Sequence, residues 1–308
     1  MKPAPALNGF TAAATVIKWL RAWYGAAEIP VATDLDLVRR ILPHTPYGRG
    51  VREILAPLPI EDAQFEGLLA RDPNDPAVWG IAYNAKARPE RQRFTIAHEL
   101  GHFVLHRNKR LAFSCDQASV HLGLDTLAGI EREADEFASN LLMPGDVLRE
   151  AIAHRRVDLH LLSDLAGRFQ VSFEALCIRF IHYTSERAIL VRWDNGYLTY
   201  EWRSKQAQRT RTKVWRTSNP QEPLPGTLAA DATTTQAWDG VDLPAHLWCP
   251  SEPQDMTLTE FKHSYRARER VLSLLILPSR EQRPSYDHKE ALADTFDRFI
   301  ERGQFPVR

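Results

Sequence analysis

The chain has 308 residues, enough for two or three domains, and 44% of them are hydrophobic, so a sizeable core can form. Its 39 basic and 39 acidic residues cancel and no run of 18 apolar residues occurs, which excludes a strong overall field toward nucleic acid and predicts no membrane span. The N-terminus lacks a basic-then-apolar signal segment and the three cysteines are widely spaced, so we expect a cytoplasmic protein without a disulfide framework.

The N-terminal part of the chain carries helical and then strand patterns. Apolar residues at helical spacing predict an amphipathic helix over residues 8–25. A shorter helix is predicted over residues 34–42, with Thr33 or Asp34 as its cap. The expected apolar side of the first helix consists of Phe10, Ala13, Val16, Ile17, Leu20 and Trp23.

Two strand patterns follow. Residues 64–69 and 78–84 alternate in the manner of strands, and residues 71–76 between them carry the Asp, Asn and Pro of a turn. The sequence therefore predicts a β-hairpin just before the segment that carries the strongest motif.

That motif is the HExxH pattern His98-Glu99-Leu100-Gly101-His102, inside an apolar run over residues 94–106. On an α-helix, residues four apart lie about 40° apart around the axis and about 6 Å apart along it, so both imidazoles can bind one metal ion. Glu99 is placed to act as general base toward water at that ion. Because the run is apolar almost all round, the helix is expected to be buried, where unpartnered His and Glu side chains would be costly. A metal is the simplest partner for them.

A catalytic zinc ion usually takes three protein ligands and one water molecule, so a third ligand is needed. His106 continues the four-residue spacing but lies about 12 Å along the helix from His98, too far to bind the same ion. We interpret His106 as a residue that supports the ligands or packs behind them. A second predicted helix, over residues 129–143, offers Glu131 near its apolar face, with Asp135 one turn later on nearly the same side. Glu131 is the predicted third ligand, and Asp135 can hold a histidine N–H in the required tautomer.

Other residues near this centre receive weaker assignments. Glu133 lies about 160° from Asp135 in helical projection, so Glu133 and Glu136 are expected on a solvated face. Residues 107–128 are expected to form a loop. Two His and one Glu make zinc the default ion, although manganese would also accept them. The alternatives for a donor to the oxyanion are Tyr83, His106 and His121.

Residues 88–102, the string Glu131-x-x-Ala134-Asp135-x-Phe137-Ala138 and the string Leu141-Leu142-Met143-Pro144 carry a family resemblance. They resemble the ImmA/IrrE family of zinc metallopeptidases, and within it the PprI/IrrE radiation-response regulators. The resemblance implies a gluzincin-like site with the ligands His98, His102 and Glu131 and with Glu99 as general base. This chain departs from many members by carrying Asp135 where they have Asn, and its loop 107–128 differs from that of the regulators.

The resemblance and the patterns together predict an α+β chain of three parts. Residues 1–150 would form a zincin-like zinc metallopeptidase domain and residues 151–184 a helical lobe that is similar to a helix-turn-helix. Residues 185–308 would form a GAF-like α/β sensor domain, ending in a helix over residues 288–300.

The helical lobe is the place where DNA binding has to be considered. Residues 158–182 predict two helices joined by a turn. Reading DNA needs basic and polar residues on the second helix, which offers Glu174, Arg179 and little else. We therefore expect a structural lobe and no direct DNA binding. The basic segment 203–213 is expected to be a solvated loop or edge strand, with nucleic-acid contact as the alternative.

Strand patterns dominate the last part of the chain. Residues 189–193 and 197–202 flank Asn195-Gly196, the dipeptide typical of tight hairpins, and residues 271–277 predict a buried strand. Residues 218–254 are rich in Pro, Thr and Asp and are expected to be loops that join short elements. Five tryptophans either line a ligand pocket or pack in the core, and core packing is the simpler interpretation. They are Trp193, Trp202, Trp215, Trp238 and Trp248.

These features predict a regulatory zinc endopeptidase. The resemblance implies that its substrate is a helix-turn-helix repressor of the XRE type, whose cleavage would derepress stress or DNA-damage response genes. The sheet of the first hairpin would either bind substrate along its edge or be purely structural. The alternative function is a non-proteolytic sensor or transcription regulator with a structural metal site. Glu99 and the lack of an evident fourth ligand favour the enzyme, because a structural zinc site needs no general base and closes its fourth position. No pattern in the sequence defines an oligomeric state.

Overall fold

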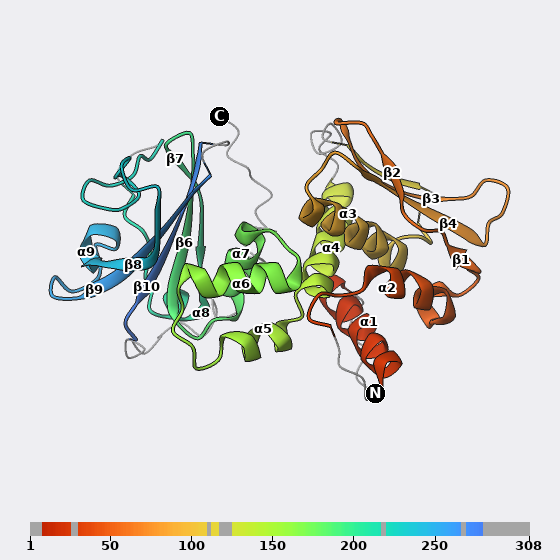
Figure 1. Ribbon diagram of the computed structural model, residues 1–308, viewed down its shortest axis with the longest axis horizontal. Helices are drawn as coiled ribbons and strands as arrows, with labels where there is room; N and C mark the ends of the chain where they lie inside the picture. Colours follow the sequence, from red (N-terminus) through yellow and green to blue (C-terminus); the bar gives the residue numbers. More distant parts are fainter. Residues whose placement is uncertain are drawn as a thin grey trace. The chain divides into compact units, whose positions relative to one another are not determined.

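The computed structural model describes residues 8–25, 30–109, 112–116, 125–216, 220–265 and 269–279. The chain divides into two compact units (Figure 1), with Met1–Ala151 and Leu165–Ser172 in unit 1 and Ile152–Asp164 and Phe173–Arg308 in unit 2. Both units mix helices and strands, so the α+β class is confirmed, while the domain boundaries at 150 and 184 stay predictions. No helix within these described ranges is long and apolar enough to cross a membrane.

Unit 1 contains a sheet and the helices that precede and follow it. Its strands are β1 (Glu53–Ile54), β2 (Leu58–Ile60), β3 (Phe65–Arg71), β4 (Val78–Asn84) and β5 (Ala112–Asp116). Its main helices are α1 (Gly9–Tyr24), α2 (Leu35–Ile41), α3 (Pro89–Leu105) and α4 (Asp125–Leu142), with short 3-10 turns η1 (Leu42–His44) and η2 (Pro46–Gly48). The helix α5 (Gly145–Ile152) follows at the boundary of the unit.

The predicted hairpin is confirmed as β3 and β4, which pair antiparallel. The sheet order is β1-β4-β3-β5, and β2 also pairs with β4. Strand β5 pairs antiparallel with β3, so part of the segment expected as the loop 107–128 is a strand. Because β3 and β4 both have neighbours on each side, the hairpin itself is not at an edge. Among the described strands, β5 is at one edge of the sheet, and β1 and β2 are at the other.

Helix α1 confirms the first predicted helix but not all of its apolar face. Ala13, Val16 and Leu20 are buried as expected. Phe10 is 49% exposed, because it lies about 100° from the centre of the buried stripe. Trp23 is 66% exposed, since it lies in the last turn, beyond the last buried position of the helix.

The second predicted helix is α2, and the structure chooses between its two candidate caps. The Asp34 carboxylate accepts a hydrogen bond of 2.9 Å from the backbone N–H of Leu37, which makes Asp34 the N-cap. The neighbouring Thr33 hydroxyl instead donates to the carbonyl oxygen of Leu141, at 2.6 Å, and so ties this segment to α4.

Helices α3 and α4 lie side by side and form the centre of unit 1 (Figure 1). They pack closely because Gly101 of α3 faces the backbone of Ala134 on α4, and a Cβ on Gly101 would lie 3.2 Å from it. Phe103 of α3 contacts Trp79 of β4 edge-on, with ring centroids 5.9 Å apart. The core of the helix pair consists of Ala97, Leu100, Phe103, Ala134, Phe137, Ala138 and Leu141, all fully buried.

Helix α1 approaches the backbone of α4 even more closely, at Gly9. A Cβ on Gly9 would lie inside contact distance of the Glu133 carbonyl oxygen and 2.7 Å from the Phe137 nitrogen, and backbone atoms cannot turn aside. We expect Gly9→Ala to lower the free energy of unfolding by about 1–3 kcal/mol or more. The matched control is Gly129→Ala in α4, where the new Cβ would meet nothing within 4 Å and helix propensity favours alanine. Urea unfolding of both variants checks this, and equal midpoints would contradict the close approach.

Unit 2 contains a five-stranded sheet of order β7-β6-β10-β9-β8 in which every pairing is antiparallel. Its strands are β6 (Arg187–Asp194), β7 (Tyr197–Arg203), β8 (Gln236–Pro244), β9 (Thr257–Tyr265) and β10 (Arg270–Leu277). The hairpin of β6 and β7 and the strand β10 confirm the predictions, and Asn195 and Gly196 both have positive φ in the turn. The other helices of unit 2 are α7 (Phe173–Tyr183), α8 (Lys205–Arg209) and α9 (Ala245–Trp248), while α6 (Leu159–Phe169) has residues in both units.

One expectation for this part of the chain was wrong. The basic segment 203–213 contains the short helix α8, whose N-cap Ser204 accepts a hydrogen bond from the backbone of Ala207, rather than an edge strand. The segment 218–254 contains two short elements joined by irregular chain, as expected: the strand β8, which pairs with β9 despite the turn-forming composition, and the helix α9. The helix expected over residues 288–300 lies outside the described residues.

The two helices expected over residues 158–182 are confirmed as α6 and α7. The polar residues of α7 are engaged within unit 2. Glu174 forms ion pairs of 3.0 Å with Arg192 and 2.9 Å with Arg270. Arg179 is buried and its guanidinium lies 4.5 Å from the ring centre of Tyr183.

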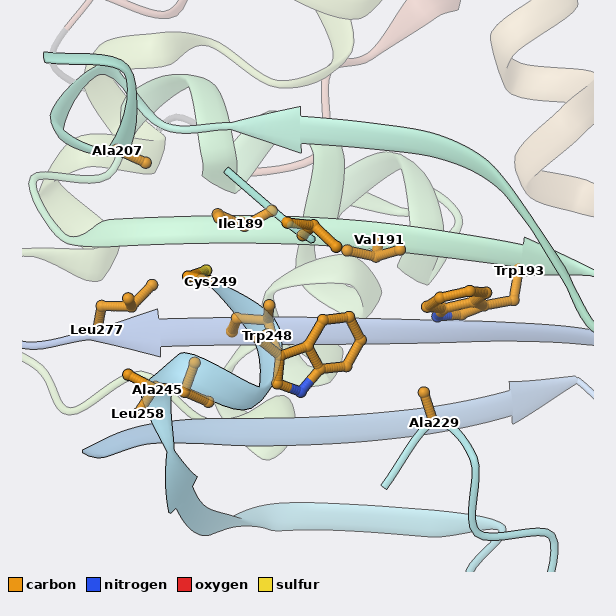
Figure 2. Packing of buried hydrophobic residues seen from close by; sticks show 12 residues of the cluster. Ile189, Val191, Trp193, Ala207, Ala229, Ala245, Trp248, Cys249, Leu258 and Leu277 are labelled. Atoms are coloured by element: carbon orange, nitrogen blue, oxygen red, sulfur yellow. The ribbon is translucent and has the colours of Figure 1, made fainter. Parts of the chain in front are cut away.

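Core packing is confirmed for two of the five tryptophans. Trp193 and Trp248 are almost fully buried in the cluster that Figure 2 shows on one face of the sheet, with ring centroids 6.0 Å apart. The strands β6, β9 and β10 contribute Ile189, Leu258 and Leu275 to this cluster. Trp215, by contrast, is 43% exposed.

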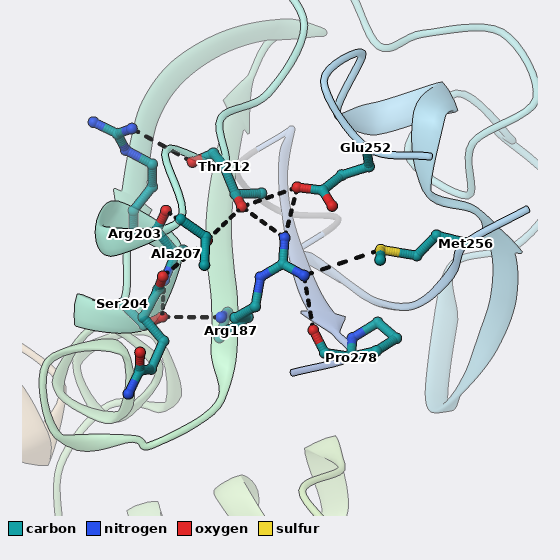
Figure 3. Close-up of polar contacts among 11 residues, drawn as sticks. Arg187, Arg203, Ser204, Ala207, Thr212, Glu252, Met256 and Pro278 are labelled. Carbon is teal, nitrogen blue, oxygen red and sulfur yellow. Dashed lines mark hydrogen bonds and ion pairs between the residues drawn. The ribbon is translucent and has the colours of Figure 1, made fainter. Parts of the chain in front are cut away.

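A buried ion pair ties several segments of unit 2 together (Figure 3). The Arg187 guanidinium donates to Glu252 at 2.6 Å, to the Thr212 hydroxyl at 2.8 Å and to the Pro278 carbonyl oxygen at 2.8 Å. Both charged side chains are buried, so each depends on the other for compensation of its charge. The start of β6 is thereby joined to the segments that follow α8, α9 and β10.

Candidate metal centre

Helix α3 presents the two histidines of the HExxH motif to the same point. Pro89 begins the helix, where its missing N–H is not needed, and the apolar residues of α3 bury it against α4 and the sheet. His98 and His102 are both buried, and their Nε2 atoms lie 2.9 Å apart. One turn of helix therefore brings two imidazole lone pairs together, as the spacing predicts.

Helix α4 adds the carboxylate of Glu131 to this pair. Its Oε2 lies 3.1 Å from His98 Nε2 and its Oε1 lies 3.4 Å from His102 Nε2. Two ligands about 2.05 Å from a tetrahedral zinc ion lie about 3.3 Å apart, so these separations are close to what one ion requires. Within the described ranges, His98, His102 and Glu131 are the one group whose donor atoms could hold a metal ion. The residues present fit a divalent cation of the zinc type.

The electrostatics of the three residues suit a cation as well. Burial lowers the pKa of His102 and so favours the neutral imidazole that can bind a metal. Burial alone would raise the pKa of Glu131, but its hydrogen bonds with His102 and His98 outweigh this and hold the pKa well below its usual range. The centre therefore combines neutral nitrogen donors with an ionised oxygen donor.

Each histidine has a further partner behind the cluster. His98 Nδ1 lies 2.9 Å from Asp135 Oδ1, which is the contact that the sequence predicts for Asp135. His102 Nδ1 lies 3.1 Å from Nδ1 of His106, which is fully buried and follows the end of α3 as its C-cap. His106 therefore supports a candidate ligand from behind and does not join the cluster itself.

Glu133 was expected on a solvated face, and this expectation was wrong. Its Oε2 lies 2.8 Å from His106 Nε2, and its side chain is 37% exposed. The buried stripe of α4 is centred on Ala134. The angle that decides whether Glu133 is solvated is therefore its angle from Ala134, and not its angle from Asp135. Measured from Ala134, Glu133 and Asp135 each lie about 100° away on opposite sides, so α3, which lies over the stripe, can be reached from both flanks.

Strand β5 supplies a neighbour that the sequence did not reveal. The ring of Phe113 stacks on that of His102, with centroids 4.7 Å apart and an angle of 12° between the planes. A Phe in a segment of loop-like composition gave no signal of this contact. Phe113 belongs to β5, which is an edge strand among the described residues, so this edge of the sheet runs beside the cluster.

Glu99 is fully buried and faces the sheet at a glycine. A Cβ on Gly67 of β3 would lie 2.5 Å from Glu99 Oε1 and 2.5 Å from the Thr95 methyl carbon. The pairing of β3 with β5 shifts register between Phe65 and Gly67, as a β-bulge does. The bulge and the missing side chain together leave the space that the Glu99 carboxylate occupies.

The expected result of Gly67→Ala is a displaced Glu99 carboxylate in a fold that still retains the metal. The stiff Thr95 methyl cannot give way easily, whereas the end of the Glu99 side chain can, so any activity that depends on Glu99 should fall. The matched control is Gly80→Ala on the neighbouring strand β4, where a new Cβ would meet nothing within 4 Å. Hydrolysis rates and bound metal, measured on both variants, check the expectation. Equal rates in the two variants would contradict it.

The three alternatives for an oxyanion donor have separate outcomes. His106 uses both ring nitrogens in its contacts with His102 and Glu133. His121 lies outside the described residues. Tyr83 is the cross-strand partner of Gly67, and cross-strand partners point to the same face of a sheet. Its side chain therefore lies on the face of the sheet that Glu99 contacts.

Comparison with known proteins agrees with this centre. Residues 58–180 match the family model of the IrrE N-terminal-like domain of the Peptidase M78 class. The matched segment contains His98, Glu99, His102 and Glu131. The match and the relatives below support the assignment of residues 58–180 to the ImmA/IrrE family of metallopeptidases, in agreement with the resemblance.

Two curated relatives are radiation response metalloproteases. IrrE of Deinococcus radiodurans is 36% identical over 126 residues, covering 41% of this chain and 38% of that protein. IrrE of Deinococcus deserti is 28% identical over 170 residues, covering 55% of this chain and 54% of that protein. The chain thus spans about half of these relatives or less. A transcriptional regulator of Mycobacterium tuberculosis is 13% identical with a TM-score of 0.48, over 87% of this chain and 76% of that one.

Proposed function

We propose that the chain is a zinc-dependent endopeptidase whose ligands are His98, His102 and Glu131. The observation that carries the proposal is the convergence of these donors next to a buried Glu99. Within the described residues the cluster has three protein donors, and a catalytic site keeps its fourth position open for water or substrate. A structural site would close it.

The chemistry of this arrangement is peptide-bond hydrolysis. A bound divalent cation would supply Lewis acidity at the scissile carbonyl and would favour deprotonation of water. Glu99 takes the proton from the attacking water on its carboxylate and passes it to the nitrogen of the leaving amine. Tyr83 is the proposed donor to the oxyanion, because it shares the sheet face that Glu99 contacts.

The substrate is proposed to bind along β5 as an additional strand. Phe113 of β5 stacks on His102, so a chain that pairs with this edge passes beside the cluster. Backbone hydrogen bonds to an edge hold an extended peptide whatever its side chains, while pockets beside the edge supply selectivity. An extended segment, such as a linker between helices, would fit this mode.

The biological role that we propose is cleavage of an XRE-type repressor in the cytoplasm, which would derepress stress or DNA-damage response genes. It is supported by the radiation response metalloproteases among the relatives. Residues 185–308 would act as a GAF-like sensor domain, for which the antiparallel sheet of unit 2 is a suitable framework. Residues 151–184 would form a helical lobe that does not read DNA, since Glu174 and Arg179 are engaged within unit 2.

The test is incubation of the purified protein with XRE-type repressors encoded near its gene, followed by intact mass measurement. We expect one repressor to be converted into two fragments whose masses sum to the original plus one water. The cut should require added zinc or manganese and should stop with a chelator. Absence of any cut in zinc-loaded protein that retains the metal would overturn the proposed substrate, and fragments that form equally in excess chelator would overturn the metal mechanism.

A further inference from the structure

A continuous row of polar atoms runs from the candidate ligand His102 to the surface of α4. His102 Nδ1 lies 3.1 Å from His106 Nδ1, and His106 Nε2 lies 2.8 Å from Glu133 Oε2. Both imidazoles are fully buried, whereas the Glu133 side chain is 37% exposed. The row thus connects the inside of the centre to a carboxylate at its rim.

With the proposed cation bound at the cluster, the protons along this row can be placed by elimination. A carboxylate only accepts hydrogen bonds, so the contact with Glu133 requires a proton on His106 Nε2. A neutral imidazole has a single N–H, so with its proton on Nε2 the Nδ1 atom of His106 is an acceptor. The contact between the two Nδ1 atoms therefore requires the proton on His102 Nδ1. This leaves the lone pair of His102 on Nε2, the atom that faces His98 and Glu131.

The opposite placement would disable the ligand. If His106 carried its proton on Nδ1, then His102 Nδ1 would have to accept it, and a neutral His102 would carry its own proton on Nε2. That proton would point at the position where a cation must bind. Both rings are fully buried. Ring nitrogens that lost their hydrogen bonds through a change of tautomer would therefore have no water to bond instead.

We propose that Glu133 is a positioning residue of the metal centre, which acts through His106 to hold His102 in the tautomer that directs Nε2 at the cation. The inference rests on the proposed metal site. His98 has the shorter version of the same arrangement, since its Nδ1 contacts Asp135 directly. Helix α4 thus supplies one ligand, Glu131, and the terminal carboxylate behind each histidine ligand.

The experiment is a double-mutant cycle read as zinc affinity, by competition with a chromophoric chelator on the full chain. Removing the outer partner of a metal-binding histidine typically weakens affinity about 10–100-fold, and we expect this loss for Glu133→Ala and for His106→Ala. Because Glu133 acts through His106, the double variant should bind zinc no more weakly than His106→Ala alone. Glu133→Gln, whose amide oxygen can still accept from His106 Nε2, should recover part of the loss. The exposed Glu150→Ala is the control and should bind zinc as the unchanged protein does.

A second readout separates tautomer from general stability. Nitrogen-15 shifts of the histidine rings in the zinc-loaded protein should show His102 and His106 protonated on Nδ1 and Nε2, respectively. Losses that add in the double variant, unchanged affinity in Glu133→Ala, or His106 protonated on Nδ1 would each overturn the proposal. Because zinc affinity is measured without a substrate, failure of repressor cleavage leaves these outcomes intact. Unchanged affinity in Glu133→Ala, together with loss of metal in Glu131→Ala, would overturn the positioning role alone.

Discussion

Glu99→Gln is expected to retain the divalent cation and to lose about 10²–10⁴-fold in the rate of peptide-bond hydrolysis. The amide has nearly the shape of the carboxylate, so residue 99 still fits the space beside Gly67. It cannot take a proton from water, however, and the ligand atoms of His98, His102 and Glu131 are unchanged. Initial rates of repressor cleavage and the bound zinc per chain, measured on the same preparation, test both halves of the expectation.

The control for this variant is Glu150→Gln, which makes the same chemical change at an exposed position of α5. It should leave rate and metal content unchanged. Since Glu99 is fully buried, the substitution also removes a buried charge, so the melting temperature of Glu99→Gln should not fall. Proteolysis at the normal rate by Glu99→Gln would show that another group acts as the base.

Glu131→Ala is expected to lose most of the bound metal, because it removes one of three donors. The loss should exceed the about 10–100-fold that follows from removal of an outer partner, and should therefore exceed that of Glu133→Ala. The two residues lie two positions apart on α4, so the pair compares a proposed ligand with a proposed supporting residue on the same helix. Metal content after dialysis and chelator competition measure the difference.

Equal zinc affinity in the two variants would show that the wrong acid was assigned as ligand. A third variant, Asp135→Ala, should have a zinc affinity between those of the other two variants. Asp135 contacts His98 directly but is not expected to bind the cation. Activity should follow metal content in Glu131→Ala, and excess zinc should restore it poorly, because two imidazoles alone bind the ion weakly.

The sequence predicted the central part of this site because residues four apart on an α-helix always lie on the same face. The structure has His98 and His102 on one face of α3, and Glu131 lies near the apolar face of α4, as both local patterns predict. What escaped prediction depends on how separate elements meet. Phe113 reaches His102 only because β5 pairs with β3, and Glu133 reaches His106 only because α3 lies over the stripe centred on Ala134.

The fold shows the same division between local and long-range causes. The β3–β4 hairpin and the hairpin with Asn195 and Gly196 follow from alternation and turn residues within a short stretch. Strand β8, in a stretch of turn-forming composition, is stabilised by pairing with β9, which lies later in the chain. Phe10 is exposed although its spacing suits a helix, because only the partner helix decides where the buried stripe is centred.

The junction of α3 and α4 would link the stability of the protein to the supply of the proposed cation. A cation held by His98, His102 and Glu131 would cross-link α3 and α4, which are separate in the sequence. The unfolded chain would not have these three ligands together and would bind the cation much more weakly. At a free zinc concentration one hundred times the dissociation constant, this linkage amounts to about 2.7 kcal/mol of added stability. Without the cation, unit 1 would then be less stable and more open to degradation, in addition to losing the proposed activity. The abundance of the protein would therefore vary with the concentration of zinc in the cell.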